Sequence, residues 1–597
     1  MWTINAQSQF FISSGEIVKV TAADELHVLE HLENNSTVDF LTLSGGNAQM
    51  ISGTGSIWHL KVDKTTGTTA SITGGMQSIY GTLNPLSGTL AAGGYLTLKS
   101  LSTGTARVAA HTTTGAVTGT VKVERYININ GKNKQWRMLG FPYSTNLQIS
   151  SITGMGMEFS ASTKTMMYYV EGNDDGRYGN AGARNAGYQT FSSTADNIQP
   201  LTGVMAWLFG PTGTTASASG TMSDSMTILS SGTLNEAGAD VSIPLSYTLS
   251  KGWNLVANPF ASNLNWSGIT KSNVEASLYR WNPHAADWTA HNGSTGTGAA
   301  TDAIIEIGTA FFVRTTAASP SLTIPQTAKT SGATGFTHLS KAPFRLDIPG
   351  QRVPSGLPLS GIRIFSSGTG NQEPGDVYLD VSRPDASSGF DIQYDAWSMG
   401  RSSGADVAFI AAEDRLLEMQ FDRPISEAGR EKRYYPLRVT GISSGSASLA
   451  LRAEGNWNPL NSISLIDHKE GKTLLMRGNE LRYDFQLESL KTDGRFTLAI
   501  NHVTLDADGQ SPVFDVKLLG NPVTGDRLQL LVTHPSANAR QWRIISTDGQ
   551  LLGRGNFQQD AGIQYGITVP AMRNAGSYLL QVEMDNGELK SVPFLRK

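Results

Sequence analysis

The histidines of one short stretch have the spacing of a zinc-peptidase motif. "HVLEH" places His27, Glu30 and His31 in the pattern H-x-x-E-H, which binds zinc when both histidines share one helix face. The surrounding "TAADELHVLEHLENN" could form such a helix, with Thr21 as its N-cap. However, no second helix follows to supply a carboxylate ligand, and the neighbouring segments have strand-and-turn character. We therefore interpret the two histidines as a solvated pair and expect no metal there.

A second stretch, "GISSG" (Gly441–Gly445), matches the serine-nucleophile pattern G-x-S-x-G around Ser443. That motif needs a strand before the serine and a helix after it, so that the hydroxyl is exposed on a sharp turn. Here the serine lies in "GISSGSAS", a flexible hairpin loop. We predict no catalytic residue and no enzyme.

Two acidic, glycine-rich loops could bind a cation. "EGNDDGRYGNAG" (Glu171–Gly182) and "DADG" (Asp506–Gly509) supply the oxygen ligands that calcium prefers. The first loop lacks the acidic spacing and closing glutamate of an EF-hand, and such clusters are common in turns. Calcium is the one cofactor that the sequence leaves open; otherwise we expect none.

An aromatic hairpin, "SLYRWNPHAADWTAHNG", is a candidate glycan site. Its Tyr279, Trp281 and Trp288 could form a platform on which sugar rings stack. A cross-strand aromatic pair would explain the same residues.

These candidates must be positioned by strands, because the composition disfavours long helices. Of 597 residues, 64 are glycine, only 16% are charged and none is cysteine, which predicts an all-β chain of several domains. Without cysteine there is no disulfide, structural Cys-zinc site or cysteine nucleophile. The net charge of -4 and the absence of a basic stripe argue against nucleic acid as a partner.

The segment at residues 1–125 is rich in Gly, Thr and Ser. Stretches such as "GSIWHLKVDKTTG" and "GYLTLKS" predict short strands between glycine turns. Their loose repetition is typical of a β-solenoid, and an ordinary glycine-rich sandwich is the alternative.

Residues 126–335 contain a duplication, in units of about 126–230 and 231–331. "QWRMLGFPYS" and "GWNLVANPFAS" both place a tryptophan, then a proline six positions on, then an aromatic residue. Each is followed by a Tyr-rich hairpin and an aromatic strand. We interpret these as tandem β-units in which Trp136 and Trp253 are buried anchors and Pro142 and Pro259 turn the chain out of the sheet.

The remaining chain predicts two further β domains. About ten alternating segments at residues 336–502 fit an antiparallel sandwich of jelly-roll type. A polar linker at residues 503–512 then precedes a small Ig-like β-sandwich at residues 513–597. In that last domain Asp548-Gly549 and Asn586-Gly587 suit hairpin turns with positive φ.

Several of these motifs together resemble a known family. "GWNLVANPFASNLNW", "YRWN" and "IEIGTAFFV" resemble the "GWNLIGNPYPSPIDW" stretch of large surface proteins of Bacteroidetes. The last 85 or so residues resemble the type A C-terminal sorting domain of the type IX secretion system (the Por system). The matching positions are Asn521, Pro522, Val523, Asp548, Gly549, Gly576, Tyr578 and Lys590. "FDVKLLG" departs from the usual approach to this motif, which affects the subtype.

The resemblance implies periplasmic transit, export by the type IX outer-membrane translocon, and an extracellular or cell-surface location. "MWTINAQSQFFISSG" has neither a basic nor a long apolar region, so we expect a trimmed or incomplete chain that has lost its Sec signal. The function expected is that of a non-enzymatic adhesin or structural exoprotein, whose partner is a surface glycan or a host or matrix ligand. The alternative is a glycan-binding accessory protein of a polysaccharide-degrading system.

Overall fold

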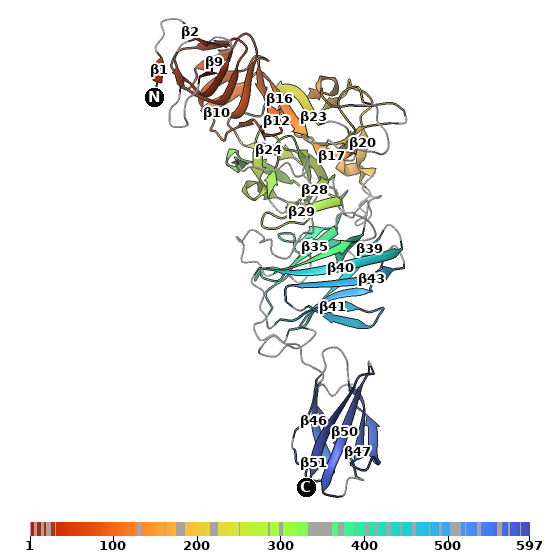
Figure 1. Cartoon of the computed structure of the whole chain (residues 1–597). Helices are drawn as coiled ribbons and strands as arrows, with labels where there is room; N and C mark the ends of the chain where they lie inside the picture. Colours follow the sequence, from red (N-terminus) through yellow and green to blue (C-terminus); the bar gives the residue numbers. More distant parts are fainter. Residues whose placement is uncertain are drawn as a thin grey trace.

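The structure is a computed structural model in which strands form nearly all of the regular structure. It describes residues 2–4, 9–12, 17–18, 26–29, 31–127, 134–161, 163–174, 186–214, 225–249, 251–283, 287–297, 303–331, 361–367, 375–387, 390–399, 405–411, 416–425, 431–441, 444–455, 461–476, 478–488, 492–501, 515–519, 521–533, 539–557, 564–570, 574–585 and 587–597. Within these ranges the helical segments are short 3-10 turns, namely η1 (Ile149–Ser151), η2 (Glu171–Asn173), η4 (Trp266–Gly268) and η5 (Gln326–Ala328). The predicted all-β class is confirmed (Figure 1).

The N-terminal region is a parallel β-solenoid, which decides between the two predicted alternatives. One column of strands contains β1 (Trp2–Ile4), β4 (Leu26–Val28), β6 (Thr37–Gly45), β8 (Ser56–Lys64), the first half of β10 (Gln77–Ala91), β11 (Leu96–Leu98) and β16 (Thr120–Ile127). The other contains β2 (Gln9–Ile12), β5 (His31–Asn34), β7 (Gln49–Ser52), β9 (Thr69–Ile72), the second half of β10 and β15 (Gly115–Thr118). Short strands β3 (Ile17–Val18) and β14 (Arg107–Val108) pair with β6 and β10, and β12 (Ser100–Leu101) pairs with β13 (Gly104–Thr105).

Apolar side chains stack in register inside the solenoid. Val38 lies opposite Ile57, and Ile57 lies opposite Ile79 on the next rung. The same column continues through Leu98 to Val123, and all five side chains are buried. Each buried aliphatic side chain of this kind contributes about 1.5–3 kcal/mol, so the column stabilises the stacking of the rungs.

The solenoid continues directly into the first repeat. Strand β16 pairs antiparallel with β23 (Met226–Thr233) along its whole length, from Thr120 opposite Thr233 to Ile127 opposite Met226. The boundary drawn at residue 125 therefore falls inside a strand, and the two units share one hydrophobic core.

The two tandem β-units have the same topology. The four-stranded sheet of the first has the order β17 (Gln135–Leu139), β22 (Val204–Leu208), β19 (Met166–Tyr169), β20 (Tyr188–Thr190). That of the second has the order β25 (Trp253–Ala257), β31 (Ala310–Thr315), β28 (Val274–Asn282), β29 (Asp287–His291). Small sheets accompany them: β18 (Leu147–Gln148) with β21 (Asn197–Ile198); β26 (Asn263–Asn265) with β30 (Ile304–Ile305) and β33 (Lys329–Thr330); and β24 (Val241–Pro244) with β32 (Ser321–Ile324) and β27 (Thr270–Ser272). The internal duplication is thus present in the fold.

The two repeats are related by a local two-fold arrangement. Leu139 and Val256 each lie three residues after their tryptophan, and Thr202 and Thr309 each lie four residues after an isoleucine of the small sheets. Leu139 bridges to Thr309, and Thr202 bridges to Val256. Equivalent residues thus exchange equivalent contacts, as in an isologous dimer interface.

The same arrangement repeats in the backbone hydrogen bonds at this interface. Gly140 N donates to Gly308 O at 3.1 Å, and Ala257 N donates to Leu201 O at 2.9 Å. Leu201 and Gly308 both have positive φ, at 65° and 76°. Gly140 is required there, because a Cβ would lie 2.3 Å from the Thr309 carbonyl oxygen.

Of the two tryptophans predicted to be buried anchors, Trp253 is buried and Trp136 is not. Trp253 is 2% exposed and packs edge-on against Tyr279, with ring centroids 4.9 Å apart. Trp136 is half-buried, in an edge contact with Trp207 at 5.6 Å. The prediction of equal burial is therefore wrong for Trp136, although both tryptophans lie at the start of equivalent strands.

Residues 361–501 form the third unit, an 11-stranded sheet wrapped around one core. Its order is β42 (Lys472–Leu475), β41 (Ile463–Asp467), β44 (Phe496–Ile500), β39 (Arg433–Thr440), β37 (Asp406–Ile410), β38 (Leu416–Phe421), β35 (Gly375–Asp380), β34 (Gly361–Ser367), β40 (Gly445–Glu454), β43 (Glu480–Leu487), and β36 (Ala396–Trp397) pairs with β38. Pairing is antiparallel as predicted, except that β35 and β38 run parallel.

Buried charges join the second repeat to this sandwich. Glu275 accepts hydrogen bonds from Arg314 Nη1 at 2.6 Å and from Trp397 Nε1 at 2.9 Å. Burial raises the pKa of the Glu275 carboxyl, and Arg314 opposes that shift. The two units also belong to one hydrophobic cluster.

In its described residues the C-terminal unit has seven strands, which form a sandwich with its own core. One sheet contains β45 (Asp515–Leu518), β46 (Arg527–Thr533) and β49 (Gln564–Thr568). The other has the order β48 (Leu551–Asn556), β47 (Ala539–Ser546), β50 (Gly576–Met584), β51 (Leu589–Arg596). All members of its hydrophobic cluster lie between Val516 and Phe594. Gly549 and Gly587 have φ of 86° and 84° in the two predicted hairpin turns, whereas Asn586 and the linker at 503–512 lie outside the described residues.

Candidate functional site

The zinc-peptidase pattern does not lie on a helix. His27 is in strand β4 and His31 in strand β5, so the two belong to different faces of one solenoid rung. The His31 ring accepts a hydrogen bond from Met50 N at 3.0 Å. In the described part of the chain no three His, Cys, Asp or Glu side chains are grouped to hold a metal. Glu30 and Ser443 lie outside the described residues.

The acidic loop considered for calcium begins with carboxylates that bind protein groups. Glu171 accepts hydrogen bonds from Thr248 N and Gly252 N, both at 2.8 Å, and so ties the first repeat to the second. Asp174 accepts from the Tyr169 hydroxyl at 2.8 Å. Both side chains are buried. Residues 175–182 and Asp506–Gly509 lie outside the described residues.

The proposed glycan platform is largely buried, which corrects the platform interpretation. Tyr279 is 0% and Trp281 8% exposed. The Tyr279 ring packs edge-on against Trp253, and its hydroxyl accepts a hydrogen bond from Trp397 N of the sandwich at 3.0 Å. Trp281 lies opposite the half-buried Trp288 in the ladder, with an edge-on contact at 5.4 Å. Tyr169 and Tyr188 form the corresponding pair of the first repeat, at 5.2 Å. The aromatics are therefore a cross-strand pair repeated by the duplication.

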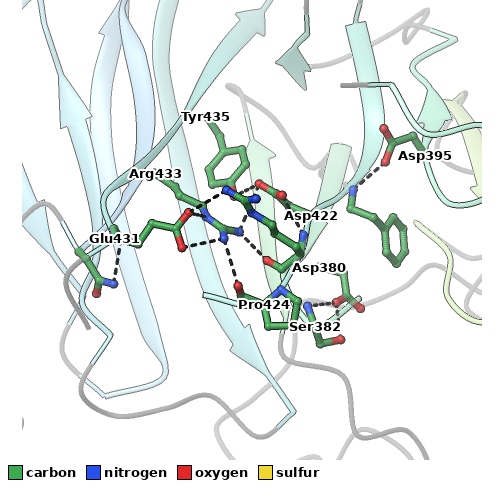
Figure 2. A network of polar contacts seen from close by, with 11 residues as sticks. Asp380, Ser382, Asp395, Asp422, Pro424, Glu431, Arg433 and Tyr435 are labelled. Atoms are coloured by element: carbon green, nitrogen blue, oxygen red, sulfur yellow. Dashed lines mark hydrogen bonds and ion pairs between the residues drawn. The ribbon is translucent and has the colours of Figure 1, made fainter. Parts of the chain in front are cut away.

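The sandwich contains a conspicuous group of acidic side chains. Figure 2 shows that Arg433 from β39 is the centre of this network. Its guanidinium donates to Glu431 at 3.0 Å and to the carbonyl oxygens of Arg423 and Pro424 at 2.5 and 3.1 Å. Asp422 accepts from the Tyr435 hydroxyl at 2.9 Å. The arginine thereby fixes the chain that follows β38.

Two other carboxylates in the same view accept backbone hydrogen bonds. Asp380 Oδ1 accepts from Ser382 N at 2.7 Å, and Asp395 Oδ1 accepts from Phe421 N at 2.7 Å (Figure 2). Burial raises the pKa of Asp395 to about 8. The Ser382 hydroxyl also donates to Asp380 Oδ1, at 2.6 Å. These contacts join loops to strands.

The residues that carry the resemblance to a sorting domain converge at one end of the C-terminal sandwich. Asn521 Oδ1 accepts from Leu595 N at 2.9 Å, and Val523 N donates to Leu595 O at 2.8 Å. The Asn-Pro-Val segment is thus attached to the end of strand β51. Gly576 pairs with Arg596 on the other side of this strand.

Tyr578 links this strand end to the neighbouring hairpin. Its ring stacks on Phe594 with centroids 5.6 Å apart, and its hydroxyl donates to Asn574 O at 2.7 Å. A tyrosine that closes on upstream backbone in this way is typical of Ig-like sandwiches. Tyr578 also lies opposite Ser546, where the Asp548-Gly549 turn begins.

Two carboxylates near these residues have lowered pKa values. A hydrogen bond from the Ser546 hydroxyl lowers the pKa of Asp548, which is exposed. A hydrogen bond from Lys590 lowers the pKa of Asp515, with the two atoms 3.0 Å apart. Lys590 lies opposite Val582, toward the other end of the sheet. Seven of the eight predicted sorting residues therefore lie at this end of the sandwich and are called the C-terminal cluster, and Lys590 lies apart from them.

The sequence interpretation missed the residues that hold this cluster together. Phe594 and Leu595 supply the ring under Tyr578 and the backbone that binds Asn521. The alternation in "LKSVPFLR" indicates their strand, but only the folded chain shows which strand end meets the Asn-Pro corner.

The fold defines this protein as an all-β, multi-unit chain with a separate C-terminal sandwich. No family model matches it. No curated protein matches it either. No helix in the described part has both the length and the apolar character needed to cross a membrane.

Several solved structures show distant likeness. The biofilm-associated protein BSP domain is 7% identical, with 41% of this chain and 76% of that chain covered and a TM-score of 0.12. A tetra-tandem repeat from the extending region of a large adhesion protein is 8% identical, with 68% and 89% covered and a TM-score of 0.12. The glycoside hydrolase domain of Endo-D from Streptococcus pneumoniae R6 is 12% identical; the match covers 28% of this chain and 35% of that one, at a TM-score of 0.10. Because these TM-scores are so low, the matches give no information about the function of this chain.

Proposed function

We propose that this chain is a non-enzymatic protein of the cell surface or the extracellular space, an adhesin or structural exoprotein exported by the type IX secretion system. The observation that carries the proposal is the convergence of Asn521, Val523 and Tyr578 on the end of β51. These residues belong to a sandwich with its own hydrophobic core. Such a unit can be recognised by a transport machine whatever cargo precedes it.

The other units support a binding or structural role. Solenoid, repeats and sandwich are joined by a shared strand pair and by buried charges, which gives a continuous β-structure (Figure 1). Figure 1 shows these three units following one another from the N-terminus. Extended β-structures of stacked units present long surfaces suited to binding.

Export is tested by removing the C-terminal unit. The full chain with a Sec signal, and a form lacking residues 513–597, are produced in a type IX-competent bacterium, and surface and periplasmic fractions are compared. We expect the shortened form to be folded and retained in the periplasm. Its arrival at the surface at normal yield would refute the sorting role.

A double substitution examines the cluster itself. Asn521→Ala with Asp548→Ala removes two polar side chains from the cluster and is expected to reduce surface yield severalfold. Arg543→Ala, an exposed substitution in the same unit, is the matched control and should be exported normally. Equal yields of the two variants would assign recognition to another part of the unit.

The alternative, a glycan-binding accessory protein, no longer has its predicted platform, because Tyr279 and Trp281 are buried. A glycan ligand would require another aromatic surface, and the solenoid provides one.

A further inference from the structure

One outer face of the solenoid carries aromatic side chains on successive rungs, of which Trp58 is exposed and the others are half-buried. Trp58 in β8 is 44% exposed, and its ring lies 5.6 Å from that of Tyr80 in β10. Phe40 in β6 stacks on His59 in β8 at 4.6 Å. Because β6, β8 and β10 are neighbouring parallel strands, the four rings form one aromatic patch on adjacent rungs.

Local backbone geometry brings these rings to the surface. Trp58 and His59 are consecutive, yet neither is buried, while Ile57 and Leu60 on either side point into the core. The register between β8 and β10 shifts at this point, between Ile79 and Thr82. The break in alternation therefore presents two adjacent outward side chains on one rung.

Charged side chains around the patch occur with partners of opposite sign. Lys61 pairs with Asp63 at 3.4 Å, and Lys99 pairs with Glu124. Asp39 and Arg107, also of opposite sign, both act electrostatically on His59, whose pKa is lowered mainly by burial. The surface thus combines aromatic rings with charged groups of both signs, and the six charges named here balance one another.

We propose that this face, centred on Trp58 and Tyr80, binds a neutral linear polysaccharide that lies along the solenoid axis. Rings 5.6 Å apart on successive rungs match the repeat of a chain built of similar sugar units. The exposed Trp58 indole and the half-buried Tyr80 phenol offer apolar area with a polar edge, as sugar rings require. An acidic glycan would need unpaired cations, and a stable protein partner would need a much larger apolar area.

A neutral polysaccharide would be the ligand of the surface protein proposed above. Its biological role rests on that proposed function, whereas the binding itself can be measured independently of export. Binding is tested with the purified full chain by affinity electrophoresis and calorimetry. The probes are soluble neutral xylan and mixed-linkage β-glucan, with alginate as the acidic comparison. We expect retardation by a neutral polymer and little effect of alginate.

Substitutions then locate the site. Trp58→Ala is expected to weaken binding by about threefold to tenfold, the range of one aromatic contact, and Trp58→Ala with Tyr80→Ala to abolish it. Tyr95→Ala is the matched control, because Tyr95 is 40% exposed and its backbone binds Gln77, three residues before Tyr80 in β10. Thermal unfolding should be unchanged in all three variants.

Three outcomes would overturn the inference: no binding to either neutral polymer, stronger binding to alginate, or equal losses for Trp58→Ala and Tyr95→Ala. The Trp58 variant should still reach the cell surface at normal yield, since its site is remote from the C-terminal cluster. Failure to bind a neutral polymer despite normal export would overturn the polysaccharide site alone. Failure of export despite normal binding would overturn the proposed sorting function alone.

Discussion

The duplication makes a quantitative prediction, because equivalent tryptophans have unequal surroundings. Trp253 is 2% exposed and contacts both Tyr279 and Phe312 edge-on. Truncating a buried tryptophan to alanine costs about 3–5 kcal/mol. Trp136 is only half-buried, so less apolar surface is lost and we expect about 1.5–2.5 kcal/mol from area alone.

Native-state hydrogen exchange measures these losses locally, which matters in a chain of several units. Peptides covering β25 and β31 should exchange roughly a hundredfold or more faster in Trp253→Ala, since 1.4 kcal/mol corresponds to a factor of ten. Peptides covering β17 and β22 should accelerate by a smaller factor in Trp136→Ala. Trp253→Phe, which keeps a ring, should fall between Trp253→Ala and the unchanged protein.

Tyr434→Ala is the control, since Tyr434 is 49% exposed. Equal acceleration by Trp136→Ala and Trp253→Ala, or a larger effect at Trp136, would refute the reasoning that links burial to the difference between the repeats.

Three further predictions concern the other units. Glu275→Ala leaves the partly buried Arg314 without its carboxylate and should cost up to about 3–5 kcal/mol. The loss should appear as faster hydrogen exchange on both sides of the junction between the second repeat and the sandwich; faster exchange confined to β28 would contradict this. Burial raises the pKa of Asp395 from 3.8 to about 8, so the folded protein favours the protonated carboxyl. The contribution of Asp395 to stability is therefore present at low pH and lost as pH rises through about 8. Calorimetry should show a flatter pH dependence of the sandwich transition in Asp395→Asn. Tyr578→Phe removes one hydrogen bond, to Asn574, and should lower the free energy of unfolding by about 1 kcal/mol. Lys590→Ala breaks a partly exposed ion pair and should lower it by less. Urea unfolding of the C-terminal unit measures both changes.

The parts of the fold that were predictable from the sequence are those with local signals. The Trp–Pro spacing around Trp136 and Trp253 indicates the duplication, and the sheet orders confirm it. Glycine turns such as Asp548-Gly549 indicate hairpins because the glycine must adopt positive φ. Regular short strands indicate an all-β chain. Their spacing alone does not distinguish a solenoid from a sandwich at the N-terminus, because parallel or antiparallel pairing depends on contacts between strands that are distant in sequence.

The candidate sites show the same limit. "HVLEH" has helical spacing, yet the rungs of the solenoid impose strands on His27 and His31. Tyr279 and Trp281 look like exposed hairpin aromatics, but residues distant in the sequence bury them, including Trp397 of the sandwich, which contacts Tyr279. Conversely, Trp58 carries no motif at all, and the sequence does not show that it and the next residue, His59, both face outward at a break in strand alternation.

The two repeats pair with each other as two copies of a dimeric protein would, but they belong to one chain. Their association therefore does not depend on protein concentration in the way that a dimer's does. Separate copies of such a unit would pair only above a concentration set by their affinity. Here β23 leads to β24 through the short segment at residues 234–240, so each repeat is held next to its partner at an effective concentration in about the millimolar range or above. The pairing that brings Leu139 to Thr309 and Thr202 to Val256 is therefore a property of one molecule, and it persists however dilute the protein becomes.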